Sequence, residues 1–212
     1  FLSPPLLTGY SKSILGKIGP AIYYLMFMIT CSISNLISCR DYILRGKKGK
    51  IISPSQLDST WLRQPKNTNL KNFKLLYVGR LKVEKGIFSL IDLIKNKKDI
   101  SLTIVGAEKG ASYNLNQSNV KIFQQQSNKL KLIKYYDDNN IFILPSFTEG
   151  HPMVLLEALA RRRPVIIFED IEHVIGDKKG IFVSKRNFVN LLGTLNHIKK
   201  NYKKIQNEMR KN

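Results

Sequence analysis

Residues 141–160 contain the segment that most limits how this chain can fold. Ile141-Phe142-Ile143-Leu144 is a short apolar run typical of a strand buried on both faces, and Pro145 ends it because proline cannot donate to a sheet ladder. Pro152 suits the first turn of a helix, where no amide hydrogen is needed. Residues 153–160 are apolar on nearly every side of that helix, which indicates burial. A buried strand that leads into a buried helix is typical of a layered α/β domain.

The turn between this strand and helix could bind an anion. The first N–H groups of a helix have no partner within the helix, and the helix dipole places positive charge there. Glu149 lies in the turn and Glu157 follows after seven intervening residues, which places the two carboxylates about two helical turns apart on roughly the same side. A diphosphate could lie over the helix start, with a hydroxyl-rich group near each carboxylate. The alternative is a helix that only packs on the sheet and carries one solvated acid.

Beyond this segment, apolar runs of strand length alternate with helix-length segments from Lys74 onward. Such alternation predicts an α/β fold with a doubly wound parallel sheet, which is the Rossmann-like class. We expect strands at 74–78, 101–105, 120–124, 141–144 and 164–168, and helices at 86–96, 128–137, 152–162 and 186–208. Ligands of such sheets bind at the carboxyl ends of the strands, which here carry Gly79-Arg80, Gly106, Ser146 to Gly150 and Glu169-Asp170.

The expected strand end at Gly79 is the second informative segment. Gly79 lets the backbone turn closely away from the sheet, and Arg80 and Lys85 can converge on one phosphate group. Arginine offers a planar, bidentate fork and lysine a point charge, and the two together suit a diphosphate. Each cation alone is a weak signal, because solvated surface cations are common. Their position ahead of Glu149 and Glu157 in the chain strengthens the interpretation.

Residues 1–66 do not show the pattern of a complete domain. We expect here a helix from Ser11 to about Leu25, a strand at 27–33, a helix at 35–44 and a strand at 50–52. One or two strands cannot close a core alone. We therefore interpret residues 1–66 as the remnant of a preceding α/β domain plus a linker, and residues 67–212 as a ligand-binding domain of the Rossmann-like class. The polar stretch 59–72 is the expected linker.

The charge of the chain narrows the classes of partner. Thirty-five Lys and Arg against fifteen Asp and Glu give a formal charge of +20, which favours nucleic acid, anionic lipid or phosphorylated small molecules. A general bias towards Lys, Asn and Ile explains much of this charge. The basic residues are spread along the chain and the aromatic residues fall mostly in strand-like positions, without a stacking platform. We therefore expect no nucleic-acid partner.

Metal, redox and membrane-spanning classes have little support in the sequence. Cys31 and Cys39 have neither metal nor redox spacing and the three histidines are scattered, so we expect no metal site and free thiols in a reducing cytosol. The apolar run from Ala21 to Cys31 is shorter than the roughly 20 residues that a membrane span needs. No signal peptide is visible, and a cytoplasmic protein is expected.

The segment from Pro145 to Ala160 resembles the signature of retaining glycosyltransferases of family 4, the glycosyl transferases group 1. In that family a Glu, seven residues and a second Glu follow a Pro-Ser strand end. The resemblance covers about residues 27–185 and is strongest at 74–86 and 141–165. It implies the C-terminal, donor-binding half of a GT-B fold of two Rossmann-like domains. It also implies transfer of a sugar from a nucleotide-sugar, which we expect to be UDP-linked, to an acceptor hydroxyl with retention.

The same resemblance implies roles for single residues. Arg80 and Lys85 would contact the donor diphosphate and stabilise the departing nucleotide, without a metal or another cofactor. Glu157 would hydrogen-bond the ribose hydroxyls, and Glu149 would lie near the donor sugar. Arg80, Lys85 and Glu149 are the expected catalytic groups. The other expected donor-binding residues are Gly79, Gly150, His151, Pro152, Met153 and Val154, the last two of which also suit core packing.

The chain departs from the family pattern near its run of three arginines. Relatives place a Gly where this chain has Arg162, and Phe168-Glu169-Asp170-Ile171 replaces a Gly-rich loop on the sugar side. His173 stands where relatives commonly have a Glu. The run Arg161-Arg162-Arg163 either extends the phosphate site or forms a solvated helix end, where cations interact favourably with the helix dipole. We favour the second interpretation.

Together these features predict a fragment of a retaining, hexosyltransferase-type enzyme of cell-envelope polysaccharide or glycolipid synthesis. We expect it to bind a nucleotide-sugar, to act with an unknown sugar or lipid-linked acceptor, and not to turn over unaided. The basic tail from Lys199 to Lys211 either presents a solvated face or contacts anionic lipid at the inner face of a membrane. The alternative hypothesis is a catalytically degenerate basic module that binds anionic membrane or nucleic acid.

Overall fold

The computed structural model describes residues 16–33, 37–38, 48–52, 57–66, 70–110, 117–176 and 178–211. The chain forms two compact units, Phe1–Ser55 and Gln56–Asn212. The expected domain boundary lay between residues 66 and 67, whereas the second compact unit begins at Gln56.

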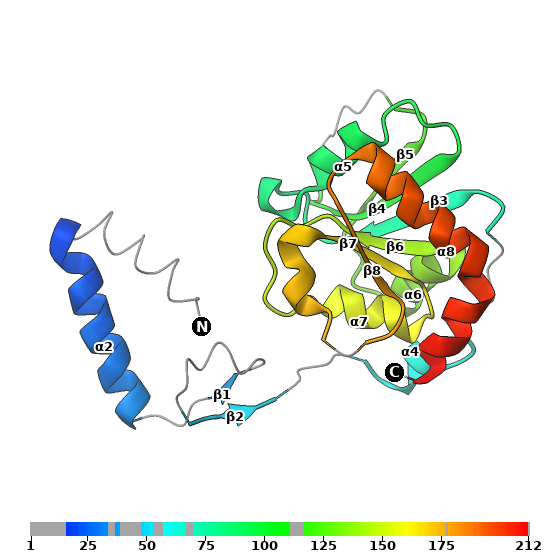
Figure 1. Cartoon of the computed structure of the whole chain (residues 1–212). Helices are drawn as coiled ribbons and strands as arrows, with labels where there is room; N and C mark the ends of the chain where they lie inside the picture. Colours follow the sequence, from blue (N-terminus) through cyan, green and yellow to red (C-terminus); the bar gives the residue numbers. More distant parts are fainter. Residues whose placement is uncertain are drawn as a thin grey trace. The chain divides into compact units, whose positions relative to one another are not determined.

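A six-stranded, fully parallel sheet forms the centre of the second unit (Figure 1), in the order β5-β4-β3-β6-β7-β8. Its strands are β3 (Phe73–Val78), β4 (Ile100–Ala107), β5 (Val120–Gln124), β6 (Ile141–Leu144), β7 (Val165–Phe168) and β8 (Ile181–Ser184). The expected doubly wound α/β fold is confirmed, and β8 is a strand that the sequence pattern did not predict. After β3, the chain adds β4 and β5 on one side of this strand and then β6 on its other side. The direction of winding therefore reverses between β3 and β6. Such a switch point is where sheets of this type bind ligands.

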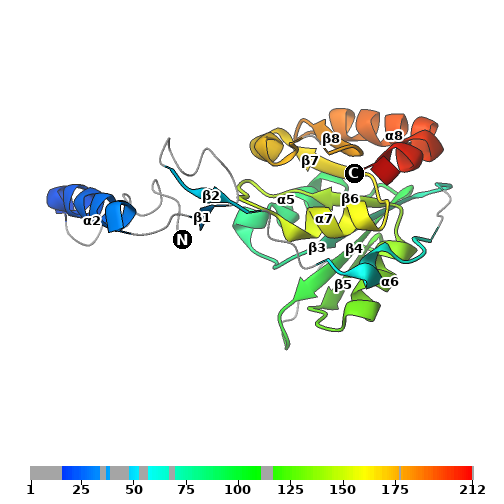
Figure 2. The ribbon, with the colours of Figure 1, turned by 90° about the horizontal axis from the view of Figure 1, so that it is seen from below.

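Helices cover both faces of this sheet (Figure 2). The helices α5 and α8 lie on one face, and α6 and α7 lie on the other together with the short α4. Their bounds are α4 (Ser59–Leu62), α5 (Ile87–Leu93), α6 (Lys129–Asp138), α7 (Met153–Ala160) and α8 (Phe188–Glu208), with short 3-10 helices η2 (Val83–Lys85), η3 (Glu169–Val174) and η4 (Met209–Lys211). The four helices that the periodicity predicted are therefore confirmed, with ends that shift by at most three residues.

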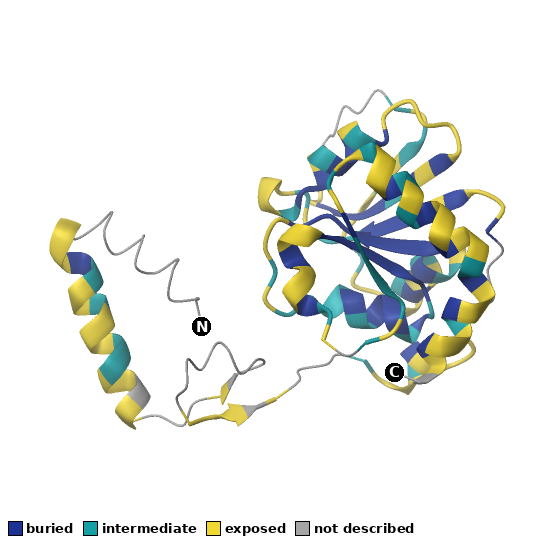
Figure 3. Ribbon diagram, in the orientation of Figure 1, coloured by how far each residue is buried: buried dark blue, intermediate teal, exposed yellow. Residues whose placement is uncertain are grey.

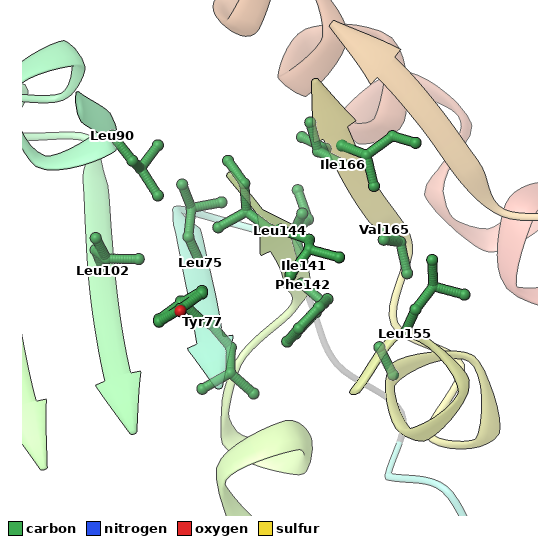
Figure 4. Close-up of a cluster of buried hydrophobic side chains, with 14 of the residues drawn as sticks. Leu75, Tyr77, Leu90, Leu102, Ile141, Phe142, Leu144, Leu155, Val165 and Ile166 are labelled. Atoms are coloured by element: carbon green, nitrogen blue, oxygen red, sulfur yellow. The ribbon is translucent and has the colours of Figure 1, made fainter. Parts of the chain in front are cut away.

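The core lies between the sheet and these two helical layers. Every residue of β6 and β7 is buried, as expected for central parallel strands covered on both faces. Figure 4 shows side chains of β3, β4, β6 and β7 meeting Leu90 of α5 and Leu155 of α7. In α8, one stripe of residues is buried and the remainder is largely exposed (Figure 3), and the stripe consists of Leu191, Leu195, Ile198, Tyr202 and Ile205. This spacing of three and four residues is the amphipathic pattern of a surface helix.

Within the expected linker 59–72, the described residues 59–66 do not behave as a linker. Asp58 caps α4 by accepting a hydrogen bond from the amide of Thr60, and its side chain also pairs with Lys129 at the start of α6. Trp61 is 3% exposed and packs edge-on against Tyr136, with 5.6 Å between the ring centroids. A buried tryptophan within a polar sequence ties this stretch to the second unit, which a pattern of exposed polar residues could not reveal.

The first unit is described by η1 (Gly16–Ile18), α2 (Gly19–Ile33), β1 (Ile37–Ser38) and β2 (Lys50–Ile51). The expected strand at 27–33 is wrong, because these residues continue α2. The hydroxyls of Thr30 and Ser32 donate to the carbonyls of Met26 and Met28, so these two polar side chains find their partners within the helix.

Residues 37 and 38 form a strand where a helix was expected, and the rest of that helix lies outside the described residues. The strand expected at 50–52 is confirmed at 50 and 51. Within the described part of the chain, no helix has the length and apolar character to cross a membrane.

Candidate active site at the carboxyl ends of β3 and β6

The topology brings the two informative segments together. β3 pairs with β6 through Leu75 opposite Ile141 and Leu76 opposite Phe142, so both strands deliver their carboxyl ends to the same edge of the sheet. Gly79 and Arg80 follow β3, and the turn from Pro145 to Pro152 follows β6. The amide of Phe147 donates to the carbonyl of Glu84 at 3.0 Å, which joins the two loops directly.

Lys85 and Glu149 form the central ion pair of this edge. The Lys85 ammonium lies 2.7 Å from Oε1 of Glu149, and the Ser146 hydroxyl donates to the same oxygen at 2.7 Å. The two charged side chains are 21% and 11% exposed, so the pair is largely shielded from solvent. Nε2 of His173 lies 2.7 Å from the backbone carbonyl of Glu149 and holds the turn from the side of η3. Two of the three expected catalytic groups are therefore in direct contact.

Two glycines allow the loops to approach so closely. Gly86 has a φ of +64°, and a Cβ at this position would lie 1.9 Å from the carbonyl oxygen of Pro145. A Cβ at Gly106, at the end of β4, would lie 2.0 Å from the carbonyl oxygen of Gly79. Neither position leaves space for a side chain. The segment with Lys85 is thus packed against the turn with Glu149 through backbone atoms.

Arg80 lies at the rim of the same edge. Its side chain is exposed, while its backbone carbonyl accepts a 2.8 Å hydrogen bond from the Tyr77 hydroxyl. Burial raises the pKa of Tyr77 above its ordinary value, and the negative charge of Glu149 raises it further. Tyr77 therefore remains a neutral hydrogen-bond donor that fixes the loop, and the Arg80 guanidinium is left directed to solvent and available to an anion.

The start of α7 supplies the backbone part of the site. Pro152 is the N-cap residue and makes no side-chain capping bond to the helix. Gly150 is exposed, and His151, Pro152, Met153 and Val154 are partly buried. These residues carry the N-terminal end of the helix dipole to the edge where Arg80 and Lys85 lie, so the positive charges of side chains and backbone act on the same space.

Glu157 occupies a more buried position than a solvated acid would. It is 8% exposed, and its Oε2 accepts a 2.8 Å hydrogen bond from the hydroxyl of the fully buried Tyr136. Burial raises the pKa of Glu157, and the hydrogen bond from Tyr136 offsets part of that rise. Tyr136 is itself held between Trp61 and Phe142, with 5.6 Å between its ring centroid and each of theirs. The structure thus excludes the alternative of a solvated acid on a packing helix.

Arg186 is a residue of this edge that the sequence did not single out. It follows β8, the strand that the pattern missed, and its guanidinium donates to the carbonyl of Pro145 at 2.9 Å and to Asp170 at 2.6 Å. The guanidinium carbon lies 4.1 Å from the ring centroid of Phe147 and 4.4 Å from that of Phe168. Arg186 therefore braces the turn after β6 through charge, hydrogen bonds and stacking.

The expectation that residues 161–163 form a solvated helix end is wrong for two of the three arginines. Arg161 and Arg163 are 2% and 1% exposed, and both pair with Asp137, which receives two bonds from Arg161 at 3.0 and 2.7 Å. Their remaining donors bind backbone carbonyls of Trp61, Arg63, Gln64, Lys66 and Tyr136. They serve the packing of α4 and its following loop against α6 and α7, and they point away from the phosphate site.

Among the residues that the structure describes, no group of three or more His, Cys, Asp or Glu is placed to hold a metal ion. Independence from metal remains a prediction.

Comparison with known proteins identifies the family. The family model described as "Glycosyl transferases group 1" matches residues 58–212. The chain is 38% identical over 91 residues to the putative teichuronic acid biosynthesis glycosyltransferase TuaC of Bacillus subtilis (strain 168), which is 43% of this chain and 23% of that protein. It is 28% identical over 147 residues to the capsular polysaccharide biosynthesis glycosyltransferase CapM of Staphylococcus aureus, which is 63% of this chain and 38% of that protein.

Solved structures agree on the fold. The structure of Anabaena Alr3699/HepE in complex with UDP and glucose superposes with a TM-score of 0.66 at 14% identity, covering 88% of this chain and 59% of that one. Sucrose-phosphate synthase from Thermosynechococcus elongatus gives a TM-score of 0.64 at 20% identity, covering 86% of this chain and 56% of that one. The chain thus spans less than two thirds of the length of each of these proteins. With a family model that matches from α4 to the C-terminal residue and a sheet of the same architecture, the chain belongs to the glycosyl transferases group 1 family.

Proposed function

We propose that the second unit binds a nucleotide-sugar, UDP-linked, and supports transfer of its sugar to an acceptor hydroxyl with retention at the anomeric carbon. One observation carries the proposal: the contact of Lys85, Glu149 and Ser146 at the edge where Arg80 is exposed and α7 begins. This edge combines two cations and a helix N-terminus for a diphosphate with carboxylates for hydroxyl groups. UDP in the Anabaena protein's structure supports the choice of nucleotide.

Each residue then has a defined task in the proposed reaction. The bond between the anomeric carbon and the phosphate oxygen breaks, and negative charge develops on the departing diphosphate. Arg80 and Lys85 stabilise that charge, a role that preorganised cations perform without a metal. Glu149 orients Lys85 and accepts from a sugar hydroxyl, and Glu157 accepts from the ribose. The acceptor oxygen bonds to the anomeric carbon and its proton leaves to the phosphate or to solvent.

We propose that such a transfer serves the synthesis of cell-envelope polysaccharides, which the names of two relatives in teichuronic acid and capsular polysaccharide biosynthesis support. The relatives are much longer than the matched part, and we propose that the present 212 residues bind nucleotide without robust turnover. The acceptor would be a growing glycan or its lipid-linked form. Robust sugar transfer by the purified chain would contradict the second proposal and leave the first in place.

Calorimetric titration of UDP tests the donor site. We expect saturable binding by the parent chain and a loss of about tenfold or more in affinity for Arg80→Ala, because one charge-assisted bond to phosphate is removed. The matched control is Arg210→Ala, which removes another exposed arginine, from η4. Glu157→Gln keeps an acceptor for Tyr136 and changes only the charge, so weaker binding by this variant reports on the ribose contact.

The two arginine variants distinguish a specific phosphate contact from attraction by overall charge. Equal UDP affinities of Arg80→Ala and Arg210→Ala would show that binding depends on overall charge and would contradict the role of Arg80. Failure of the folded parent to bind UDP, uridine diphosphate sugars or other nucleoside diphosphates would overturn the proposed donor site.

A further inference from the structure

A cavity lies at the end of the sheet opposite the candidate active site. It has a volume of about 500 Å³ and opens where β3 and β4 begin, between the loop after α5 and the first half of α8. Phe73 and Ile100, the first residues of the two strands, line it. The candidate active site is at the carboxyl ends of these strands, roughly 20 Å away for a strand the length of β3. A ligand in one site therefore does not touch the other.

Cations dominate the rim of this cavity. Lys71, Lys97, Lys98 and Lys199 line it together with one acid, Asp99, which gives a formal charge of +3. The lysines come from three segments that are far apart in the sequence. The chain is rich in lysine throughout, so charge alone does not distinguish this place. Four lysines from three segments line one hollow, and this does distinguish it.

Two of the ammonium groups are held in position by aromatic rings. Nζ of Lys97 lies 4.1 Å from the ring centroid of Phe188, and Nζ of Lys199 lies 5.5 Å from that of Phe73. A cation over the face of a ring loses part of its rotational freedom while it keeps its charge. Lys97 and Lys199 thus flank the cavity as placed donors, which reduces the entropy that binding would otherwise cost.

The interior of the cavity is suited to an organic ligand. Phe73 and Ile100 are buried, Leu192 is partly buried, and the three form apolar wall surface. Three asparagines line the cavity together with the lysines: Asn72 just before β3, Asn96 in the loop after α5, and Asn196 in α8. The volume is within the range of about 300–1,000 Å³ that small-molecule sites occupy. Amides and apolar wall fit the body of a ligand, and lysines fit its anionic groups.

We propose that this cavity binds a phosphate-bearing organic ligand with two or more negative charges, at a site separate from the donor nucleotide. Lys97 and Lys199 contact the phosphate groups, because ammonium groups donate strongly to phosphate oxygens. The phosphate groups belong either to a soluble sugar phosphate or to a lipid headgroup, which present the same chemistry to the cavity. The proposal does not depend on the proposed transferase reaction.

The experiment uses the full chain at physiological ionic strength, where non-specific attraction is screened. One arm adds fructose 1,6-bisphosphate and follows backbone amide resonances by NMR. The other arm measures co-sedimentation with phosphatidylcholine vesicles that contain phosphatidylglycerol. The test variant is the pair Lys97→Gln and Lys199→Gln. The control variant is the pair Lys200→Gln and Lys204→Gln, which removes the same charge from exposed positions of α8 outside the cavity.

The expected result is saturable binding in at least one arm that the test pair weakens by about tenfold and the control pair by less than about twofold. In the soluble arm, shifts at the amides of Lys98, Asp99 and Phe188, without shifts at Gly150, place the ligand in the cavity. If the chain binds only the vesicles, and the test pair weakens this binding more than the control pair, the phosphate groups belong to a lipid headgroup. The proposal is overturned when both pairs weaken binding equally, when the shifts centre on Gly150, or when neither probe binds at millimolar concentration.

Discussion

At the scale of single residues, the main finding is how Glu157 is held. A carboxylate with 8% exposure needs a partner, because burial without one is costly. Tyr136 supplies it at 2.8 Å and is immobilised by the rings of Trp61 and Phe142. In the proposed function, the ribose would approach a carboxylate that is already oriented on one oxygen. Tyr136 is thus a positioning residue for Glu157.

This arrangement predicts a dependence of stability on pH. Burial raises the folded-state pKa of Glu157 above its ordinary value of 4.5, so the folded protein holds this proton more tightly than the unfolded chain. The contribution of Glu157 to stability is therefore complete below that value and falls as the pH rises through the folded pKa. Glu157→Gln should gain stability relative to the parent by about 1.4 kcal/mol for each unit of the rise in pKa. Urea unfolding of both proteins across this pH range measures the difference; a difference that shrinks with rising pH would contradict the prediction.

Arg162 gives a second prediction at this scale. Its φ is +52°, a left-handed conformation that suits glycine, and relatives of the resembled family place glycine there. Arg162→Gly should raise the free energy of unfolding by about 0.5–1 kcal/mol, because the strain of a side chain in this conformation is removed. Arg162→Ala removes the same charge but keeps the strain and is the control. Chemical denaturation of both variants distinguishes the two effects; an equal gain for both would assign it to charge.

At the scale of elements, the site depends on two loops that meet through their backbones. Gly86 is the C-cap residue of η2, and its α-carbon faces the carbonyl of Pro145, just after β6. This contact sets the position of Lys85 relative to Glu149. Arg186 braces the same turn from the end of β8. The geometry of the ion pair therefore depends on the ends of three strands, β3, β6 and β8, and not on one loop.

Gly86→Ala tests this contact. The added Cβ would lie 1.9 Å from a backbone oxygen at a φ of +64°, so we expect a loss of at least about 2 kcal/mol in the free energy of unfolding. Gly193→Ala is the control, since its Cβ meets nothing within 4 Å and α8 should gain up to about 1 kcal/mol. Thermal and urea unfolding measure both. Equal behaviour of the two variants would show that the loops do not meet as described.

At the scale of the whole second unit, the stretch 57–66 is part of the compact structure. Arg161 donates to the carbonyls of Trp61 and Arg63 at 2.8 Å each, across about a hundred residues of sequence, and Asp137 compensates the buried charge. A buried guanidinium with an ion-pair partner and several carbonyl partners is costly to disturb. The arginines near the end of α7 therefore join this early segment to the sheet domain.

Two adjacent residues of α4 test this role. Trp61 is 3% exposed and Leu62 is 64% exposed, although both are large and apolar. Trp61→Ala should lower the free energy of unfolding of the second unit by about 3–5 kcal/mol, as for other buried aromatic side chains, while Leu62→Ala should change it by less than about 0.5 kcal/mol. Hydrogen exchange at the amides of β6 and β7 reports on the sheet specifically. If both variants changed the free energy of unfolding by similarly small amounts, residues 57–66 would be a linker and not part of the compact unit.

Much of the sheet could be predicted from the sequence, because its signals are local. Apolar runs such as Ile141–Leu144 and Val165–Phe168 indicate buried strands, and the turns that follow them indicate which edge carries the ligand. β8 escaped prediction since its residues are only partly buried at the sheet edge, except for Ser184. The prediction of a strand at 27–33 was wrong because the β-branched and hydroxyl residues there are accommodated within a helix.

The sequence by itself determined the order of strands and helices from β3 to β7, together with α8, the two motifs with Arg80 and Glu149, and the family. These depend on residues within a few positions of one another, where spacing and residue type suffice. Only the tertiary structure decided that Glu157 is buried beside Tyr136, that Arg161 and Arg163 are buried cations, and that Arg186 supports the site. The physical reason is that burial and pairing are decided by contacts between distant segments. The presence of an arginine or a glutamate in the sequence does not reveal whether water or protein surrounds its side chain.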